Sequence, residues 1–403
     1  MKPKTFMLIA GEASGDLLAA ELVAALRAKA LEIESKPSDD MQPLRTPLAP
    51  HFFGAGGPRM AAAGVELAFD MTKHSVIGLS DALKKYFKFR RLFNQLQKVA
   101  IERQPDAIIC VDFSGFNRRF ARAIKSRVRR RLSAFNNWNP RIVQYVSPQV
   151  WASRPGRAYQ LAEDFDLLLA IFPFEKSWYA TRVPKLRVEF VGHPMVERYQ
   201  KAENKRQKAD NGSRPGIVLL PGSRVDELRR HLPVILGALA RMKPELPGLC
   251  ARMILPNEAL ARQAKTLGIP TDVEIQVGHL PEALAEADLA ITKSGTITME
   301  CAFFGVPTVV FYKTSWPSYF AARMVANVKH IAMPNLLAGE EIFPEFVQAA
   351  ATPDNIARAG LELLRDHTPR RNIQMRLAEI IASLGEAGAN ARAAAAILKL
   401  LET

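Results

Sequence analysis

The stretch GIVLLPGSRVDEL, residues 216–228, contains the pattern that decides the fold. Residues 216–220 are apolar or small and predict a buried strand. The turn Pro221-Gly222-Ser223-Arg224 follows, and a helix opens at Val225. A buried strand that passes through a glycine-containing turn into a helix is typical of parallel α/β sheets, whose ligands bind beyond the carboxyl ends of the strands.

The same alternation continues on both sides of this stretch. The expected strands, by residue number, are 5–10, 51–53, 107–111, 142–146, 167–171, 188–191, 216–220, 251–255, 273–277, 289–292 and 308–312. Helical periods lie between them, among others at 16–29, 83–103 and 118–131. Two successive sets of this kind predict two Rossmann-like domains, each a doubly wound parallel sheet, that face each other across a cleft.

The length supports two domains, because 403 residues exceed one ordinary core and domains of roughly 150–200 residues are expected. The segment 201–215 is polar and charged, as a linker is. We therefore expect domains at 1–200 and 201–403. From about residue 372 an Ala- and Leu-rich helical stretch is expected to pack back across the first domain.

The composition excludes several classes of protein. Hydrophobic residues make up 48% and charged residues 24%, which argues against a disordered or membrane-spanning chain. Cys110, Cys250 and Cys301 are scattered and form neither a disulfide framework nor a metal-ligand spacing. The apolar run near the N-terminus is too short for a signal peptide, so the cytoplasm is the expected compartment. The net charge of +15 attracts nucleic acid, acidic lipid or phosphorylated substrates without choosing between them.

The turn at 221–224 is the first half of a predicted anion site. Gly222 lets backbone N–H groups approach a phosphate, and Ser223 can donate a hydrogen bond. The guanidinium of Arg224 can donate bidentate hydrogen bonds to phosphate oxygens. An ordinary strand-to-helix turn with an exposed arginine is the open alternative.

A second turn, Lys293-Ser294-Gly295-Thr296, follows the expected strand at 289–292 and precedes a helix. A small, glycine-containing turn at a helix N-terminus attracts anions, and Lys293 adds a positive charge. Glu300 lies one to two turns into that helix, where a carboxylate can accept hydrogen bonds from ribose hydroxyls. Alternatively, Ser294 or Thr296 is a plain N-cap and Glu300 a solvated residue.

Two glycine-rich turns also follow strands of the first domain. They are Gly11-Glu12-Ala13-Ser14-Gly15-Asp16 and Gly54-Ala55-Gly56-Gly57-Pro58-Arg59-Met60. Neither has the spacing of a dinucleotide fingerprint or a P-loop. Both turns let a ligand approach the backbone closely, or they are tight βα connections only.

Asp112 follows the apolar run 107–111 and is a candidate general base, because a carboxylate at the carboxyl end of a strand points to the ligand side of the sheet. A turn or N-cap aspartate is the alternative. His193, in Val191-Gly192-His193-Pro194, lies near the domain crossover as a hinge or a site residue.

Taken in order, these motifs resemble those of the lipid-A-disaccharide synthases, inverting glycosyltransferases with the GT-B fold. The matching stretches are collinear over nearly the whole chain: GEASGD (11–16), GAGGPRM (54–60), YVSPQVWASRPGR (145–157), FPFEKSWY (172–179), FVGHPM (190–195), LLPGSRVDE (219–227), TKSGTITME (292–300) and MPNLLAGEE (333–341).

The resemblance implies a hexosyltransferase that condenses UDP-2,3-diacylglucosamine with 2,3-diacylglucosamine 1-phosphate. The acceptor's 6-hydroxyl attacks the anomeric carbon and UDP leaves, with no metal or other cofactor. Asp112 would then be the base, and Arg224 would stabilise the leaving diphosphate. The implied UDP-binding residues are Gly222, Ser223, Arg224, Lys293, Ser294, Gly295, Thr296 and Glu300. The implied acceptor or donor-sugar loops contain Gly11, Glu12, Ser14, Gly15, Gly56, Gly57, Asn117 and Ser147.

The resemblance also assigns residues 75–93 to a membrane-facing surface, where Lys and Arg alternate with Tyr, Phe and Leu. It implies peripheral association with the anionic inner leaflet of the inner membrane, no nucleic-acid partner, and a homodimer as one open assembly state. The same residues also suit nucleic-acid binding or an ordinary amphipathic helix.

The chain departs from the family pattern at Gly115, where a second aspartate is usual, and at Glu340, where an arginine is usual. Segments 35–50 and 133–140 are expected surface loop insertions. The competing functions are a UDP-GlcNAc 2-epimerase, an acetylglucosaminyltransferase with a lipid-linked muramyl acceptor, and a basic non-catalytic protein that binds membrane or nucleic acid. The stretches at 145–157 and 172–179 weigh against both enzymes, and the two phosphate turns weigh against the binding protein.

Overall fold

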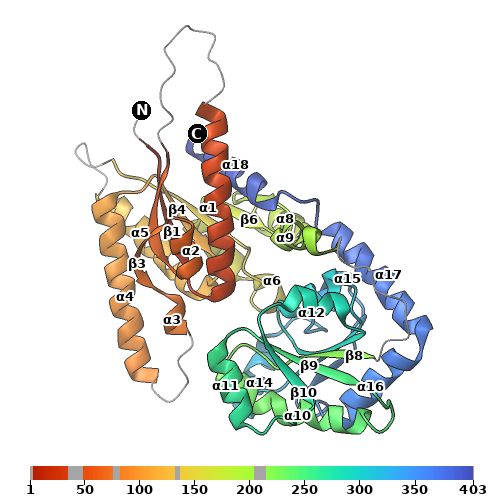
Figure 1. Ribbon diagram of the computed structural model, residues 1–403. Helices are drawn as coiled ribbons and strands as arrows, with labels where there is room; N and C mark the ends of the chain where they lie inside the picture. Colours follow the sequence, from red (N-terminus) through yellow and green to blue (C-terminus); the bar gives the residue numbers. More distant parts are fainter. Residues whose placement is uncertain (1–2, 35–48, 76–81, 132–136, 204–214, 403) are drawn as a thin grey trace. The chain divides into compact units, whose positions relative to one another are not determined.

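A computed structural model describes residues 3–34, 49–75, 82–131, 137–203 and 215–402 (Figure 1). The described chain forms two compact α/β units. Unit 1 comprises the described part of Met1–Pro194 with that of Glu386–Thr403, and unit 2 comprises the described part of Met195–Gly385. The expected loops at 35–50 and 133–140 and the segment 75–93 lie partly outside the described residues.

Unit 1 contains a sheet of seven parallel strands in the order β3-β2-β1-β4-β5-β6-β7. The strands are β1 (Thr5–Ala10), β2 (His51–Gly56), β3 (Glu66–Asp70), β4 (Ala107–Val111), β5 (Arg141–Tyr145), β6 (Leu167–Ala170) and β7 (Arg187–Phe190). The helices are α1 (Ala13–Glu34), α2 (Pro58–Ala62), α3 (Thr72–Ser75), α4 (Ala82–Arg103), α5 (Ser114–Arg131), α6 (Val150–Ser153), α7 (Arg157–Asp164), α8 (Pro173–Arg182) and α18 (Ala389–Glu402). Every residue of β4 is buried, as its unbroken apolar sequence predicts for a central parallel strand.

Unit 2 repeats this plan with six parallel strands in the order β10-β9-β8-β11-β12-β13. The strands are β8 (Gly216–Leu220), β9 (Cys250–Leu255), β10 (Val273–Val277), β11 (Leu289–Lys293), β12 (Thr308–Tyr312) and β13 (Glu345–Val347). The helices are α10 (Val225–Met242), α11 (Glu258–Thr266), α12 (Leu280–Glu286), α13 (Ile297–Phe303), α14 (Trp316–Val325), α15 (Met333–Ala338), α16 (Pro353–Arg365) and α17 (His367–Ser383). The predicted fold class of two parallel-sheet α/β domains is therefore confirmed.

All the strands expected from the sequence are present, with ends that differ by a few residues in some cases. The sequence analysis missed β3 and β13, which lie at the edges of the two sheets. Both are short and contain a glutamate, and neither has a fully buried pattern. The other two edge strands, β7 and β10, each keep one buried residue, whereas β3 and β13 keep none and so lack the apolar signal that predicted the other strands.

The last helix, α18, belongs to unit 1 and packs against α1 (Figure 1). Its Asn390 accepts a hydrogen bond from the hydroxyl of Tyr145 at 2.9 Å, and Arg392 donates to the carbonyl of Val191 at 2.8 Å. The preceding helix, α17, stays in unit 2 against α13, α15 and α16.

Helix α9 (Pro194–Glu203) lies almost entirely in unit 2, so the units divide before the polar segment at 201–215. The ring of Tyr199, on α9, packs against Phe303 and Phe304, with ring centroids 5.6 and 5.4 Å away. These apolar contacts bind α9 to unit 2.

Candidate functional site

The predicted site turns lie where the strand order of each sheet reverses. In unit 1 the reversal is between β1 and β4, and in unit 2 it is between β8 and β11. Ala10 pairs with Val111, and Leu220 pairs with Thr292, so the turns after each strand pair begin side by side. Such reversal points open a crevice at the carboxyl ends of the strands and are the usual ligand sites of open α/β sheets.

In unit 2, the turn after β8 closes around the carboxylate of Glu227, which is in the first turn of α10. The backbone N–H of Ser223 donates to its Oε2 at 2.9 Å, and Arg224 Nη1 lies 3.7 Å from Oε1. Gly222 has φ +134°, and a Cβ there would lie 2.5 Å from Oε2 of Glu227. The turn therefore requires glycine at this position, as a close backbone approach does.

The turn after β11 brings a second cation to the same carboxylate. Lys293 Nζ lies 3.6 Å from Oε1 of Glu227, and both side chains are largely buried. Gly295 has φ +150°, and a Cβ there would stand 3.0 Å from Lys293 Nζ. Thr296 is the N-cap residue of α13 and makes no side-chain cap hydrogen bond. The structure thus brings together Gly222, Ser223, Arg224 and Lys293 around an acidic side chain that the sequence analysis had not assigned.

Ser294 and Glu300 already have protein partners. The Ser294 hydroxyl donates to the carbonyl of Ile331 at 2.7 Å, which ties the turn to the segment before α15. Glu300 accepts a hydrogen bond from the hydroxyl of Tyr199 at 2.8 Å. Burial raises the pKa of Glu300, and the hydrogen bond from Tyr199 opposes this rise. Nothing in the sequence pointed to Tyr199, because it lies on the far side of a polar segment.

A buried histidine holds the turn after β8 in place. His231 Nδ1 lies 2.6 Å from the carbonyl of Pro221, and Nε2 lies 3.1 Å from the carbonyl of Lys313 and 3.4 Å from its N–H. A neutral ring with its proton on Nδ1 donates to Pro221 and accepts from the N–H of Lys313, whereas a charged ring would donate to both carbonyls. Burial lowers the pKa of His231, which favours this neutral form. His231 therefore links the end of β8 to the end of β12.

In unit 1, the backbone at Asp112 is strained. Asp112 and Phe113 have φ of +49° and +42°, in the left-handed region that non-glycine residues avoid. The side-chain amides of Asn117 and Gln144 donate to the Asp112 carbonyl at 2.8 and 3.1 Å, and both are fully buried. Asn117, predicted as a sugar contact, thus has a structural use in holding this turn. Strain retained in this way is typical of functional sites.

The side chain of Asp112 faces the first glycine turn. A Cβ on Gly15 would lie 3.7 Å from the Cβ of Asp112, and a Cβ on Gly11 would lie 2.3 Å from the ring of Phe113. Burial raises the pKa of Asp112, and the negative charge of Glu12 raises it further. The structure therefore brings Gly11, Glu12 and Gly15 to the candidate base, and it exposes Ser14 in the first turn of α1.

The second glycine turn is held by Asp16. Its buried carboxylate accepts from the backbone N–H groups of Gly57, Arg59 and Met60 at 2.7, 3.0 and 3.1 Å. A Cβ on Gly56 would collide with the sulfur of Met60 at 2.0 Å. Gly56 is thus explained by its packing against Met60 and Gly57 by its packing against Asp16, a site-shaping residue that the sequence analysis did not single out.

Ser147 belongs to a buried polar cluster with Tyr179 and Glu175. Its hydroxyl donates to that of Tyr179 at 3.2 Å, and Trp151 Nε1 donates to Glu175 Oε1 at 3.1 Å. Burial raises the pKa of Glu175 to about 7, against the hydrogen bonds from Trp151 and the backbone N–H of Phe172. The ring of His193 lies beside that of Phe172, with centroids 5.6 Å apart.

The two positions that depart from the family pattern have simple surroundings. A Cβ on Gly115 would meet nothing within 4 Å, so packing does not exclude an aspartate there. Glu340 accepts from Arg376 at 3.0 Å, in an exposed ion pair.

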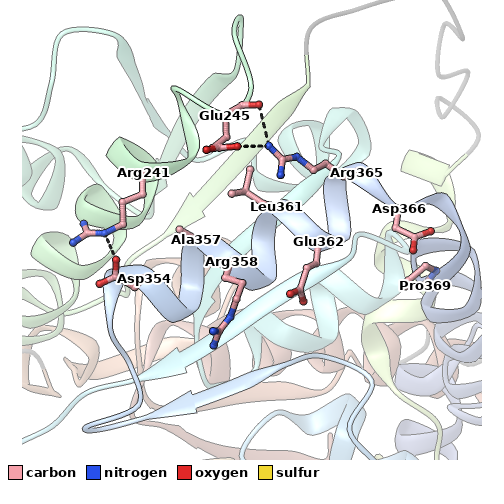
Figure 2. Close-up of a pocket in the computed structure, with 10 residues that line it drawn as sticks. All are labelled: Arg241, Glu245, Asp354, Ala357, Arg358, Leu361, Glu362, Arg365, Asp366 and Pro369. Atoms are coloured by element: carbon pink, nitrogen blue, oxygen red, sulfur yellow. Dashed lines mark hydrogen bonds and ion pairs between the residues drawn. The ribbon is translucent and has the colours of Figure 1, made fainter.

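A groove of about 830 Å³ between α10 and α16 lies apart from these turns (Figure 2). Ion pairs line it, Arg241 with Asp354 at 2.6 Å and Arg365 with Glu245 at 2.6 Å (Figure 2). None of the residues that line it is a predicted site residue.

The described residues also bear on metal binding and on membrane crossing. Among these residues, no three His, Cys, Asp or Glu side chains gather closely enough to hold a metal ion. Within the same part of the chain, no helix is both long and apolar enough to cross a membrane.

Comparison with known proteins gives matches over almost the whole chain. The family model described as lipid-A-disaccharide synthetase matches residues 6–400. A lipid-A-disaccharide synthase from Myxococcus xanthus is 34% identical, with 99% of this chain and 98% of the relative covered. Among solved structures, the calicheamicin glycosyltransferase CalG4 has a TM-score of 0.56 at 15% identity, covering 100% of this chain and 99% of its own. A UDP-GlcNAc 2-epimerase from Neisseria meningitidis has a TM-score of 0.51 at 12% identity, with full coverage of both chains. These two structural likenesses concern the GT-B fold alone.

Proposed function

Because the chain belongs to the lipid-A-disaccharide synthase family, we propose that it transfers a diacylglucosamine unit from UDP-2,3-diacylglucosamine to 2,3-diacylglucosamine 1-phosphate. Family membership makes the chain a hexosyltransferase of lipid A biosynthesis. The acceptor's 6-hydroxyl oxygen forms a bond to the anomeric carbon as the bond from that carbon to the diphosphate breaks. The hydroxyl proton passes to a base, and UDP leaves with the bonding electron pair.

The observation that carries the proposal is the arrangement around Glu227 in unit 2. Arg224 and Lys293, from the turns after two neighbouring strands, meet at one carboxylate. A diphosphate offers more negative charge than one carboxylate and suits the same two cations and the N–H of Ser223. Donors fixed before the reaction stabilise the charge that develops on a leaving group most effectively. The turns after β8 and β11 are therefore our proposed diphosphate site, with Glu300 near the ribose.

Asp112 is our proposed base. Its backbone is fixed by Asn117 and Gln144, and burial raises its pKa towards the range in which a carboxylate can take a proton effectively at neutral pH. Gly11, Glu12 and Gly15 lie beside it and are proposed to shape the sugar site.

Both substrates carry acyl chains, so we propose that the enzyme works at the surface of the inner membrane, on its cytoplasmic leaflet. Phe87, on α4 within the segment expected to face the membrane, is 61% exposed. The net charge of +15 favours an anionic surface. A homodimer stays a prediction, which sedimentation equilibrium would test.

The experiment measures UDP release from the donor with and without the acceptor. Acceptor-dependent release should fall by about 10²–10⁴-fold in Asp112→Asn, while UDP affinity stays within about twofold. Release that persists in this variant would exclude Asp112 as the base.

The diphosphate site has its own variant and control. Arg224→Ala should weaken UDP binding by roughly tenfold or more, because a charged hydrogen bond is lost. Arg229→Ala, an exposed arginine further along α10, should leave binding unchanged. Equal UDP affinity in Arg224→Ala and the native chain would remove the 221–224 turn from the site.

The 2-epimerase alternative has only a fold likeness at 12% identity, against 34% identity to a lipid-A-disaccharide synthase over nearly the whole chain. No observation favours the muramyl-acceptor transferase or a non-catalytic binding protein.

A further inference from the structure

Helix α14 of unit 2 has exposed apolar side chains. None of its ten residues is buried. Trp316, Phe320 and Met324 follow one another at intervals of four, so they share one face of the helix. Their exposed fractions are 53%, 57% and 87%. A helix of a globular protein normally turns such a stripe towards a core, so within the part of the chain that the structure describes this face lacks the partner that its composition suits.

The aromatic residues of α14 form a preassembled patch. The rings of Trp316 and Phe320 stack with centroids 5.8 Å apart, and Tyr319 lies 5.9 and 5.6 Å from them. Arg323 donates a hydrogen bond to the Tyr319 hydroxyl at 3.2 Å. An isolated helix of this length is marginal in water, so a surface that covers the patch would stabilise it.

The chain segment that contains this patch, up to Glu340 and Glu341, carries charge of one sign. Residues 313–339 contain Lys313, Arg323 and Lys329, and they contain no aspartate or glutamate. Helices with tryptophan and phenylalanine on one face and basic residues beside them are typical of the membrane interface. The apolar stripe therefore matches the boundary between acyl chains and headgroups, and the cations match anionic phosphates.

The position of α14 also fits an acylated ligand. The helix follows β12, which is paired with β11 in a parallel sheet, so α14 starts at the edge that carries the Lys293 turn. His231 ties Lys313, three residues before α14, to the turn after β8. A donor whose diphosphate is bound at these turns would thus be held at the edge of the sheet where α14 starts.

We propose that α14 inserts Trp316, Phe320 and Met324 into the surface of an anionic lipid bilayer, so that unit 2 binds the membrane in its own right. The inference rests on the proposed function for the acylated donor, whereas the contact with lipid follows from α14 itself. It is separate from the membrane-facing segment expected at 75–93, which lies in unit 1.

A site-specific probe tests the contact directly. Cys110 and Cys301 are buried and Cys250 is exposed, so a Cys250→Ser background allows one added cysteine to be labelled. An NBD label on Met324→Cys should shift to the blue with phosphatidylcholine vesicles that contain phosphatidylglycerol. The same label on Met375→Cys, at a methionine of α17 that is 52% exposed, should not shift. An unchanged spectrum at position 324 while the chain sediments with vesicles would overturn the proposal.

If something other than lipid covers the patch on α14, the label at position 324 gives a different result. A blue-shifted label before vesicles are added, growing with protein concentration, would show a second copy of the chain on α14 and overturn the proposal. A blue-shifted label that does not depend on concentration or lipid would show that the same chain covers the patch, with the same consequence.

Activity separates this inference from the proposed function. A variant with Trp316→Ser, Phe320→Ser and Met324→Ser should partition at least about tenfold less onto anionic vesicles. It should keep UDP release within about twofold when both substrates are dispersed in detergent. Equal vesicle partition of variant and native chain would contradict the α14 contact. Absence of acceptor-dependent UDP release in the native chain would contradict the proposed function and leave the lipid contact standing.

Discussion

Lys293 Nζ lies 3.6 Å from Oε1 of Glu227, and this pair joins the turn after β11 to the first turn of α10. Arg224 approaches the same oxygen at 3.7 Å. A carboxylate of the protein thus occupies the place of an anion between the two cations of the proposed diphosphate site. Both members of the Lys293 pair are less than one-fifth exposed, so solvent and salt screen them little.

Replacing Glu227 should make the thermal stability of the chain depend more strongly on bound UDP. Glu227→Ala leaves Lys293 and the N–H of Ser223 without their partner, so the free energy of unfolding should fall by about 1–3 kcal/mol. Saturating UDP supplies another anion, so the rise in Tm on adding UDP should be larger than in the native chain. Thermal unfolding with and without UDP measures this rise. The neighbouring Asp226→Ala is the control, and an equal rise in Glu227→Ala would contradict the prediction.

His231 should make stability fall in mild acid. Burial lowers its pKa from 6.5, so as the pH falls the unfolded chain binds the proton before the folded chain does. The contribution of neutral His231 is present above about pH 6.5 and is lost as the pH falls towards the lowered pKa. His231→Gln should lose less stability than the native chain between pH 7.5 and 5.5 in urea titrations. His279→Gln, at a largely exposed histidine, should follow the native curve.

Glu12 should set the acid limit of catalysis. Its negative charge adds to the burial that raises the pKa of Asp112, and Asp112, as the proposed base, must be ionised to act. Glu12→Gln should therefore lower the pKa of Asp112 and move the acid limb of the kcat/KM profile to lower pH. A uniform loss of activity with an unmoved limb would show that Glu12 acts otherwise. Glu32→Gln, an exposed glutamate in α1, the helix that follows Glu12, is the matched control.

Glu175 should cost the chain stability as the pH rises from about 4.5 to 7. Burial raises its pKa to about 7 from 4.5, so its contribution is full below about pH 4.5 and is lost as the pH rises through 7. Glu175→Gln keeps an acceptor for Trp151 and cannot ionise. The variant should gain on the order of 3 kcal/mol relative to the native chain between pH 5 and pH 8. Urea unfolding at both pH values measures this gain. An equal change in the free energy of unfolding in the variant and the native chain would contradict the prediction.

The central strands and their turns could be predicted because continuous burial leaves an unbroken apolar sequence. Ala107–Val111 is such a strand, and the residue after it, Asp112, is therefore easy to place at a carboxyl end. The edge strand Glu345–Val347 has three partly exposed residues and leaves no such signal.

The partners of the site residues could not be predicted, because they come from distant parts of the chain. Asp16 caps a turn on another strand, and Tyr199 meets Glu300 on a helix that a polar segment separates from it. Glu227 left one usable signal, an acidic residue three positions after Arg224 in the first turn of a helix. The sequence pattern does not show whether such a carboxylate faces solvent or the turn, since this depends on the φ of Gly222.

Helix α18 makes the folding of unit 1 depend on the order in which the chain is synthesised. The ribosome makes β1 to β7 first, then all of unit 2, and only then the residues that pack on α1 and bind Tyr145 through Asn390. Until α18 emerges, the hydroxyl of Tyr145 lacks its hydrogen bond to Asn390 and α1 lacks its packing against α18. Unit 2, whose residues form one uninterrupted stretch, can complete its core earlier. The half of the enzyme translated first is thus the half that finishes folding last.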